Sequence, residues 1–172
     1  MNEIGAAFVL KAQDLFTNDY LPKIERCLER LTDEQVWWRP NEESNSIGNL
    51  VLHLCGNARQ WIACGVGGAT DTRDRSQEFA ERSLISRDDL LGSLHQTIVD
   101  VDKTLAGFDL SNLLQPRLIQ GCEVMTLDAI FHVVEHFSMH TGQIILLTKL
   151  LTESDLGFYD FSAGVPAADW RR

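Results

Sequence analysis

The sequence lacks the features that mark membrane and exported proteins. No run of apolar residues approaches the length of about 18 that a membrane-spanning helix needs, and the N-terminus has no basic segment followed by a long apolar one. We therefore expect a cytoplasmic protein with no membrane partner. The four cysteines include no CxxC pair, so they are most simply interpreted as buried thiols in a reducing compartment.

Basic residues are also scarce. The 15 lysines and arginines are outnumbered by 25 acidic residues, which gives a net charge of −10, and the basic residues form no stripe. Since proteins bind nucleic acid mainly through Lys and Arg contacts to phosphates, we expect no nucleic-acid partner. GxSxG, P-loop and GxGxxG motifs are absent too, so the sequence indicates neither a nucleophile elbow nor a nucleotide site.

What the sequence does contain is the composition of an ordinary globular domain. Apolar residues make up 44% of the 172 residues and charged residues 23%, and no repeat or linker divides the chain, so we predict a single domain over 1–172. Four segments with apolar residues at helical spacing predict an all-α protein, and they cover residues 3–30 (interrupted at Pro22), 46–63, 86–105 and 126–151. The expected N-caps are Thr32 (with Gln35), Ser46, Ser86 and Thr126.

The connection between the second and third predicted helices is unusually long. It has about 20 residues, more than neighbouring antiparallel helices need. At about 3.3 Å per residue, this segment is long enough to cross back over a helix of about 30 Å. The length therefore favours a four-helix bundle with one long crossover over a simple up-down-up-down order.

Three of the five histidines lie in the last predicted helix, at His132, His136 and His140, each four residues after the one before. Residues four apart lie on one face of a helix, so two imidazoles with this spacing can bind one metal ion. His132 and His140 are separated by about 12 Å along the helix axis, too far to share an ion with bonds of about 2 Å. The chelating pair is therefore either His132 with His136 or His136 with His140.

The apolar face of this helix distinguishes the two pairs. His140 lies closest to that face, His136 lies on its flank, and His132 points furthest away. The residues that mark the face are Ile130, Val133, Phe137, Ile144 and Leu151. We therefore predict that His136 and His140 are the metal-binding pair, and that His132 either stands behind the ligands or is exposed.

A third ligand has to come from another helix, and His53 is the best candidate. Its position beside the apolar stripe of the second helix matches that of His136 in the last one. Three imidazoles would leave at least one coordination position for water or substrate, as in catalytic metal sites. The candidates for side chains that support the ligands from behind are His132, Asn57, Gln60 and Glu135. The alternative is that these histidines are core or surface residues that bind no metal.

Two segments of the chain resemble the DinB/YfiT-like family of metalloenzymes. The first, EQVWWRPNEESNSIGNLVLHLCGN, is similar to the family's WRP…S/N-I-x-x-L-x-x-H-L segment. The second, TLDAIFHVVEHFSMHTGQI, is similar to its H-x-x-x-H-x-G-Q-I segment, and the order and spacing agree. The resemblance implies a four-helix bundle in up-down-down-up order, often a homodimer. It also implies that His53, His136 and His140 bind a divalent metal ion, commonly zinc or nickel.

The resemblance also suggests an activity. Characterised members of that family include S-transferases that use a low-molecular-weight thiol and a thiol-dependent isomerase, which implies a metal-dependent transferase acting on a small electrophile. A water-activating hydrolase would use the same ion but needs a base, and Asn57 rather than an acid stands one turn after His53. The alternative from another class is a non-catalytic dimeric binding or sensor protein with a structural or vestigial metal site.

Overall fold

The computed structural model describes residues 2–170, and these are mostly helical, as the sequence predicts. The first helical segment runs through α1 (Asn2–Leu15), the π-helical turn η1 (Phe16–Tyr20) and α2 (Leu21–Glu29). The second begins after the short α3 (Asp33–Trp37) and comprises α4 (Ile47–Ala58) and the π-helical η2 (Arg59–Val66). Then follow α5 (Arg75–Ala80), α6 (Arg87–Ala106), the 3₁₀ turn η3 (Leu110–Asn112) and α7 (Thr126–Thr152).

Two short antiparallel hairpins, which the all-α prediction does not contain, connect or follow the helices. Strands β1 (Pro116–Ile119) and β2 (Cys122–Met125) join η3 to α7, with Ile119 opposite Cys122. Gln120 and Gly121, with φ of 54° and 77°, form their two-residue turn, and positive φ at both positions is what a type I′ hairpin turn requires. Strands β3 (Tyr159–Asp160) and β4 (Ala167–Ala168) lie in the C-terminal segment.

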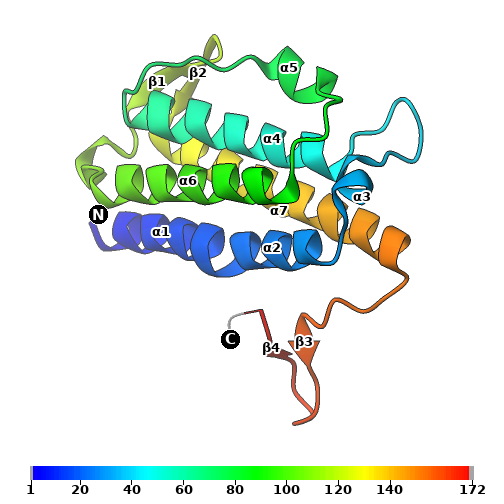
Figure 1. The fold of residues 1–172 in the computed structure, drawn as a ribbon. Coiled ribbons are helices and arrows are strands. Elements are labelled where there is room, and N and C mark those ends of the chain that lie inside the picture. The colour runs from blue at the N-terminus through cyan, green and yellow to red at the C-terminus, as the bar shows by residue number, and fades with distance from the viewer. Residues whose placement is uncertain (1, 171–172) are drawn as a thin grey trace.

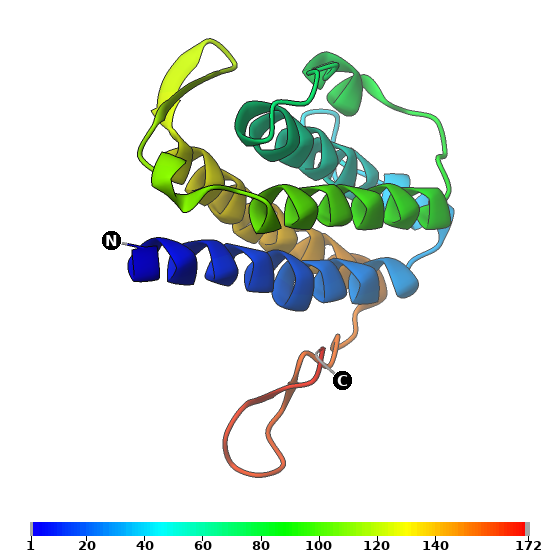
Figure 2. The same cartoon turned by 90° about the vertical axis from the view of Figure 1, so that its left-hand side faces the viewer.

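The long helical segments pack side by side around one apolar core (Figures 1 and 2). Every segment contributes fully buried side chains, among them Phe16, Leu28, Leu54, Leu94 and Phe137. The connection between η2 and α6 runs back along α4, and α5 packs on α4 within it (Figure 1). Within the described residues, no helix is both long and apolar enough to span a membrane.

Three of the four predicted N-caps are confirmed. Thr126 is the exception, because it is the first residue of α7 and its hydroxyl donates to the carbonyl of Gln115 at 3.1 Å instead of capping the helix. Thr32 and Ser46 each accept a hydrogen bond from the backbone N–H three residues later, and Gln35 and Asn49 complete the two capping boxes. Ser86 caps α6 in the same way through the N–H of Asp89. These caps satisfy backbone donors that the first turn of a helix leaves without partners, so they determine where the helices begin.

The interruption predicted at Pro22 is a π-helical turn followed by the start of a new α-helix within one continuous helical segment. Pro22 stands in the first turn of α2, directly after η1, where the N–H of Leu21 bonds to the carbonyl of Phe16. Because proline has no N–H, the carbonyl of Asn18, four residues earlier, is left without its helical partner. The indole N–H of Trp170 donates to that carbonyl at 3.2 Å. The end of the chain therefore completes the hydrogen bonding of the first segment.

The C-terminal segment is attached to α2 by two basic side chains. The guanidinium of Arg26 donates to the carbonyls of Gly157 at 2.7 Å and Asp169 at 3.2 Å. Lys23 places its ammonium 4.1 Å from the centre of the Trp170 ring, a cation–π contact. The rest of the β3–β4 hairpin projects away from the helices (Figure 1). The segment is thus held at its base while its tip remains exposed.

Candidate metal-binding site

The structure brings together the three histidines predicted to share an ion. His53 comes from α4, while His136 and His140 come from the neighbouring α7. One ring nitrogen of each lies within 4.8 Å of the other two, and the Nε2 atoms of His53 and His136 are 2.9 Å apart. His53 and His140 are 5% and 8% exposed, and His136 is half-buried. The site therefore lies at the boundary between core and surface.

The outer nitrogen of His53 is held by an ion pair from the connection between η2 and α6, residues 67–86, which we call the crossover segment. Nδ1 of His53 lies 2.8 Å from Oε2 of Glu78. Arg73 donates to both carboxylate oxygens of Glu78, at 2.7 and 2.8 Å, and all three side chains are at most 10% exposed. If Nδ1 carries the proton and donates it to Glu78, Nε2 keeps its lone pair toward His136.

The outer nitrogen of His140 has a partner of the same kind. Its Nδ1 lies 2.6 Å from Oε1 of Gln143, one turn along α7, so that Nε2 keeps the lone pair for the site. The ring of His136 lies between the other two, with centroid distances of 4.8 Å to His53 and 4.4 Å to His140. Two of the three rings are thus oriented by neighbours that leave the inner nitrogen able to bind an ion.

The electrostatics of the site favour neutral imidazoles. Burial first, and then repulsion from His140, His53, His132 and Arg73, lower the pKa of His136 from 6.5 to about 3. Burial also lowers the pKa of His140, although the hydrogen bond with Gln143 acts in the opposite direction. Neutral imidazole is the form that binds metal ions. The site therefore presents uncharged nitrogen donors at neutral pH.

This donor set fits a divalent ion. Two nitrogens bound to one tetrahedral ion at about 2.0–2.1 Å lie about 3.3–3.4 Å apart, close to the 2.9 Å between Nε2 of His53 and Nε2 of His136. Without an ion, a proton on one of these two nitrogens is donated to the other at this distance, and a bound cation takes the place of that proton. The geometry and the chemistry of the three imidazoles thus agree with the metal site predicted from the sequence.

His132 lies beside the site, not in it. Its ring is half-buried between Trp61 and His136, at centroid distances of 4.2 and 5.4 Å. Its Nε2 is 3.2 Å from Nδ2 of Asn57. The possibility that His132 is simply exposed is therefore wrong, because the end of α4 and the start of η2 cover the flank of α7 from which it projects. Asn57, in turn, contacts His132.

The other two supporting candidates lie further from the three histidines. Gln60 accepts a hydrogen bond from Arg73 at 2.9 Å and donates one to Asp71 at 2.6 Å. It therefore supports His53 only through the Arg73–Glu78 pair. Glu135 is exposed on α7. Within residues 2–170, the hydrogen-bond partners of the three rings do not include it.

Sequence reasoning missed Glu78, Arg73 and Gln143. Gln143 could have been found, because it stands three residues after His140 in the HTGQI segment and therefore on the same helix face. Glu78 and Arg73 carry no such signal. They belong to a polar connection without periodicity, and only its course along α4 brings them to His53.

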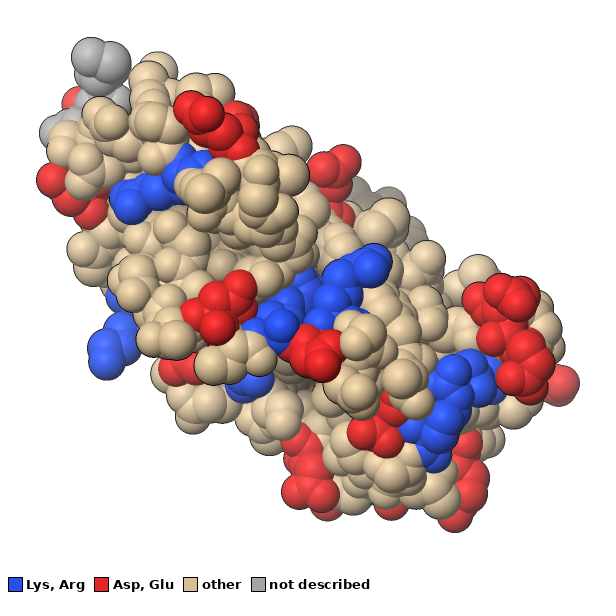
Figure 3. Space-filling model, turned by 90° about the horizontal axis from the view of Figure 1, so that it is seen from above, with Lys and Arg blue, Asp and Glu red and all other residues tan. Residues whose placement is uncertain are grey.

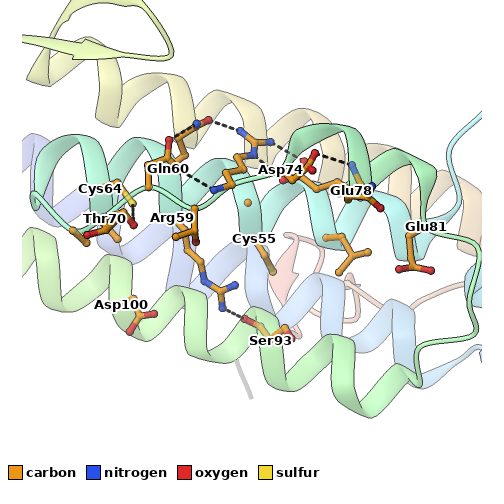
Figure 4. A pocket seen from close by; sticks show the side chains of 18 of the residues that line it. Cys55, Arg59, Gln60, Cys64, Thr70, Asp74, Glu78, Glu81, Ser93 and Asp100 are labelled. Carbon is orange, nitrogen blue, oxygen red and sulfur yellow. Dashed lines mark hydrogen bonds and ion pairs between the residues drawn. The ribbon is translucent and has the colours of Figure 1, made fainter.

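A groove of about 510 Å³ lies next to the Arg73–Glu78 pair, between the crossover segment and helices α4 and α6. Its lining includes Cys55, Arg59, Gln60, Cys64, Glu78 and Asp100 (Figure 4). Both members of the ion pair line the groove, and their other side contacts His53. The pair therefore stands between the groove and the histidine.

On the face that carries α5 and the β1–β2 hairpin, basic and acidic side chains are interspersed (Figure 3).

Comparisons with known proteins agree with the helical fold. The family model described as "Protein of unknown function (DUF1572)" matches residues 3–163. The structure of a DinB-like protein from Bacillus cereus ATCC 10987 superposes with a TM-score of 0.61 at 15% identity, over 77% of this chain and 85% of that one. A conserved protein from Enterococcus faecalis gives a TM-score of 0.68 at 13% identity, over 90% and 98% of the two chains. A comparison with curated proteins finds no match. At the level of the fold, the DinB-like resemblance inferred from the sequence is confirmed.

Proposed function

The chain belongs to the DUF1572 family of proteins of unknown function, and we propose that it is a metal-dependent enzyme whose divalent ion is held by His53, His136 and His140. The observation that carries the proposal is the convergence of one nitrogen from each ring within 4.8 Å. Glu78 and Gln143 hold the outer nitrogens of two of the rings. Imidazole ligands suit zinc and nickel, and we propose one of these as the resident ion.

For the reaction we propose transfer of a low-molecular-weight thiol to a small electrophile. A divalent ion bound at this site supplies Lewis acidity, which lowers the pKa of a thiol or water that coordinates it. In the transfer, the thiol loses its proton to solvent and its sulfur forms a bond with an electrophilic carbon. The bond from that carbon to the leaving group breaks, and the leaving group departs with the electron pair. The three histidines hold the reaction centre, and the packing around His53 and His140 limits access of water.

The ion pair beside His53 favours thiol transfer over hydrolysis. A hydrolase needs a base to accept a proton from water, and the acid in contact with the histidines is Glu78. Burial acts to raise the pKa of Glu78, but hydrogen bonds from Arg73 and His53 outweigh it and lower the pKa. This carboxylate is thus ionised but fully engaged, which makes it a poor proton acceptor for substrate. Thiol chemistry, in which solvent can take the proton, is the better match.

We also propose the finer features of fold and assembly that the family resemblance implies. An up-down-down-up order over one domain is supported by Figure 1, where α4 and α6 run in the same direction and the connection between them runs back along α4. A homodimer is supported by exposed apolar side chains on α7, among them Phe131, Met139, Leu146 and Leu150. The cytoplasmic location and the absence of nucleic-acid and membrane partners stay predictions.

Metal analysis of the purified protein tests the shared premise. We expect a divalent ion in the wild-type protein and in a His95→Ala control, because His95 is exposed on α6 and pairs with Glu25 away from the site. We expect most of the metal to be lost in His140→Ala, which removes one of three ligands. Equal, near-zero metal in the wild type and in His140→Ala would contradict the proposal.

The activity needs a separate test once metal is found. The protein is incubated with a panel of small thiols and electrophiles, and loss of free thiol is followed with and without a chelator. Metal-dependent consumption of one thiol supports the transferase. A metal-loaded protein that is inactive across the panel contradicts it and supports the second candidate, a non-catalytic dimeric binding or sensor protein.

A further inference from the structure

A glycine in the last turn of α4 is explained by the ion pair beside His53. Gly56 lies inside the helical segment, because η2 continues α4 from Arg59 to Val66, and within a helix glycine costs about 1 kcal/mol relative to alanine. A Cβ at this position would lie 1.8 Å from Oε1 of Glu78 and 2.9 Å from Nε of Arg73. Gly56 therefore leaves the space in which the carboxylate of Glu78 is seated against α4.

The backbone around Glu78 is anchored to the same helix. Nδ2 of Asn49 donates to the carbonyl of Glu78 at 2.9 Å and to that of Glu81 at 3.2 Å. The ring of Phe79 packs on His53 at 4.6 Å between centroids. None of the six residues of α5, all of them described, is fully buried. Polar contacts with α4 and the packing of one ring on His53 thus determine where Glu78 lies.

Two side chains compete for the outer nitrogen of His53. Oε2 of Glu78 lies 2.8 Å from Nδ1, and Nη2 of Arg73 lies 3.1 Å from the same atom. Glu78 accepts a proton held on Nδ1, whereas Arg73 can only donate to an Nδ1 lone pair. In the second case the ring proton sits on Nε2, the atom that faces His136, and His53 cannot bind an ion through it. The carboxylate therefore selects the tautomer that can bind metal.

We infer that Glu78 is a positioning residue for the metal site: seated in the space left by Gly56 and held by Arg73, it orients His53 and selects its tautomer, and so sets the affinity for the ion. The inference rests on the proposed function, since it requires an ion at the three histidines. A carboxylate behind a ligating histidine fixes the ring and raises its basicity, and its loss typically weakens metal binding by about 10–100-fold. The crossover segment is in this way part of the site.

The test uses two variants that disturb Glu78 by different means and leave every proposed ligand intact. Glu78→Gln removes the charge, and Gly56→Ala displaces the carboxylate with a methyl group. Gly92→Ala is the matched control, because it makes the same change inside α6, where a Cβ meets no described atom within 4 Å. Zinc affinity of the metal-free proteins is measured by competition with a chromogenic chelator. We expect both variants to bind zinc about 10–100-fold more weakly than wild type, and Gly92→Ala to bind it equally well.

Two further readouts separate positioning from a general loss of structure. Both substitutions act through one contact. The zinc affinity of the double variant should therefore equal that of whichever single variant binds zinc less tightly. The visible absorption of the Co²⁺-loaded protein should change in both single variants, while each metal-free variant still unfolds in a single cooperative transition.

Each outcome has one interpretation. Wild-type affinity in Gly56→Ala and Glu78→Gln, or additive losses in the double variant, would overturn the role of Glu78 while the metal site stands. Absence of zinc binding by the wild-type protein would overturn both the proposed function and this inference.

Discussion

Mild acid should destabilise the metal-free protein, because the folded state keeps His136 neutral. Burial and the charges of His53, His132, His140 and Arg73 lower the pKa of this imidazole from 6.5 to about 3. Between these two values the unfolded chain binds a proton that the folded protein does not. The free energy of unfolding therefore falls as the pH falls through this range.

The magnitude follows from the linkage between proton binding and folding. One group shifted in this way changes the free energy of unfolding by at most about 1.4 kcal/mol per pH unit, and by about 2 kcal/mol between pH 7 and pH 5. The pKa values of His140 and His132 are also lowered by burial, so these groups add to the effect. Acidic side chains of the unfolded chain titrate mostly below this interval, so the histidines dominate over most of it.

Urea titrations in the presence of a chelator, at pH 7, 6 and 5, measure this dependence. We expect the free energy of unfolding of the wild type to fall steadily as the pH falls. In a His136→Gln variant it should fall by up to about 1.4 kcal/mol less per pH unit, because one titrating group is missing. An identical slope in wild type and His136→Gln, or greater stability at pH 5 than at pH 7, would refute the electrostatic argument.

Three further substitutions test the core, the C-terminal segment and the second oriented ring. Phe137→Ala removes a fully buried ring that packs 5.2 Å from Phe16, and chemical denaturation should show a loss of about 3–5 kcal/mol, with a much smaller loss for Phe137→Leu. Trp170→Phe removes the hydrogen bond to Asn18 and should cost about 1 kcal/mol, with faster proteolytic cleavage of the C-terminal segment. Gln143→Leu removes the partner of His140 Nδ1 and should weaken zinc binding without lowering the melting temperature of the metal-free protein.

Local patterns were enough to predict the four long helical segments and most of their starts, but not the short α5 within the polar connection. The capping residues Ser46 and Ser86 act within one turn of their own helix, so their role can be inferred without knowledge of the rest of the fold. The same holds for the spacing of His136 and His140. The π-helical turn before Pro22 was missed because its hydrogen bonding is completed by Trp170, far along the chain.

The supporting residues of the site depended on contacts that no local pattern contains. His132 was placed furthest from the core by the apolar face of α7 alone, but the end of α4 and the start of η2 cover that flank and bury half of the ring. Glu78 lies in a polar connection whose sequence resembles any solvated loop. Only Gly56, an otherwise costly residue inside a helix, marks the place where this connection approaches.

The division of the site between α4 and α7 has a consequence for folding kinetics. His136 and His140 are neighbours on one helix as soon as α7 forms, whereas His53 is 83 residues from His136 in sequence and joins them only when the helices dock. Long-range contacts of this kind form late, after most loop-closure entropy has been lost. An ion that needs all three imidazoles should therefore change the folding rate little and slow unfolding strongly. The metal would then contribute mainly to the kinetic stability of the native state.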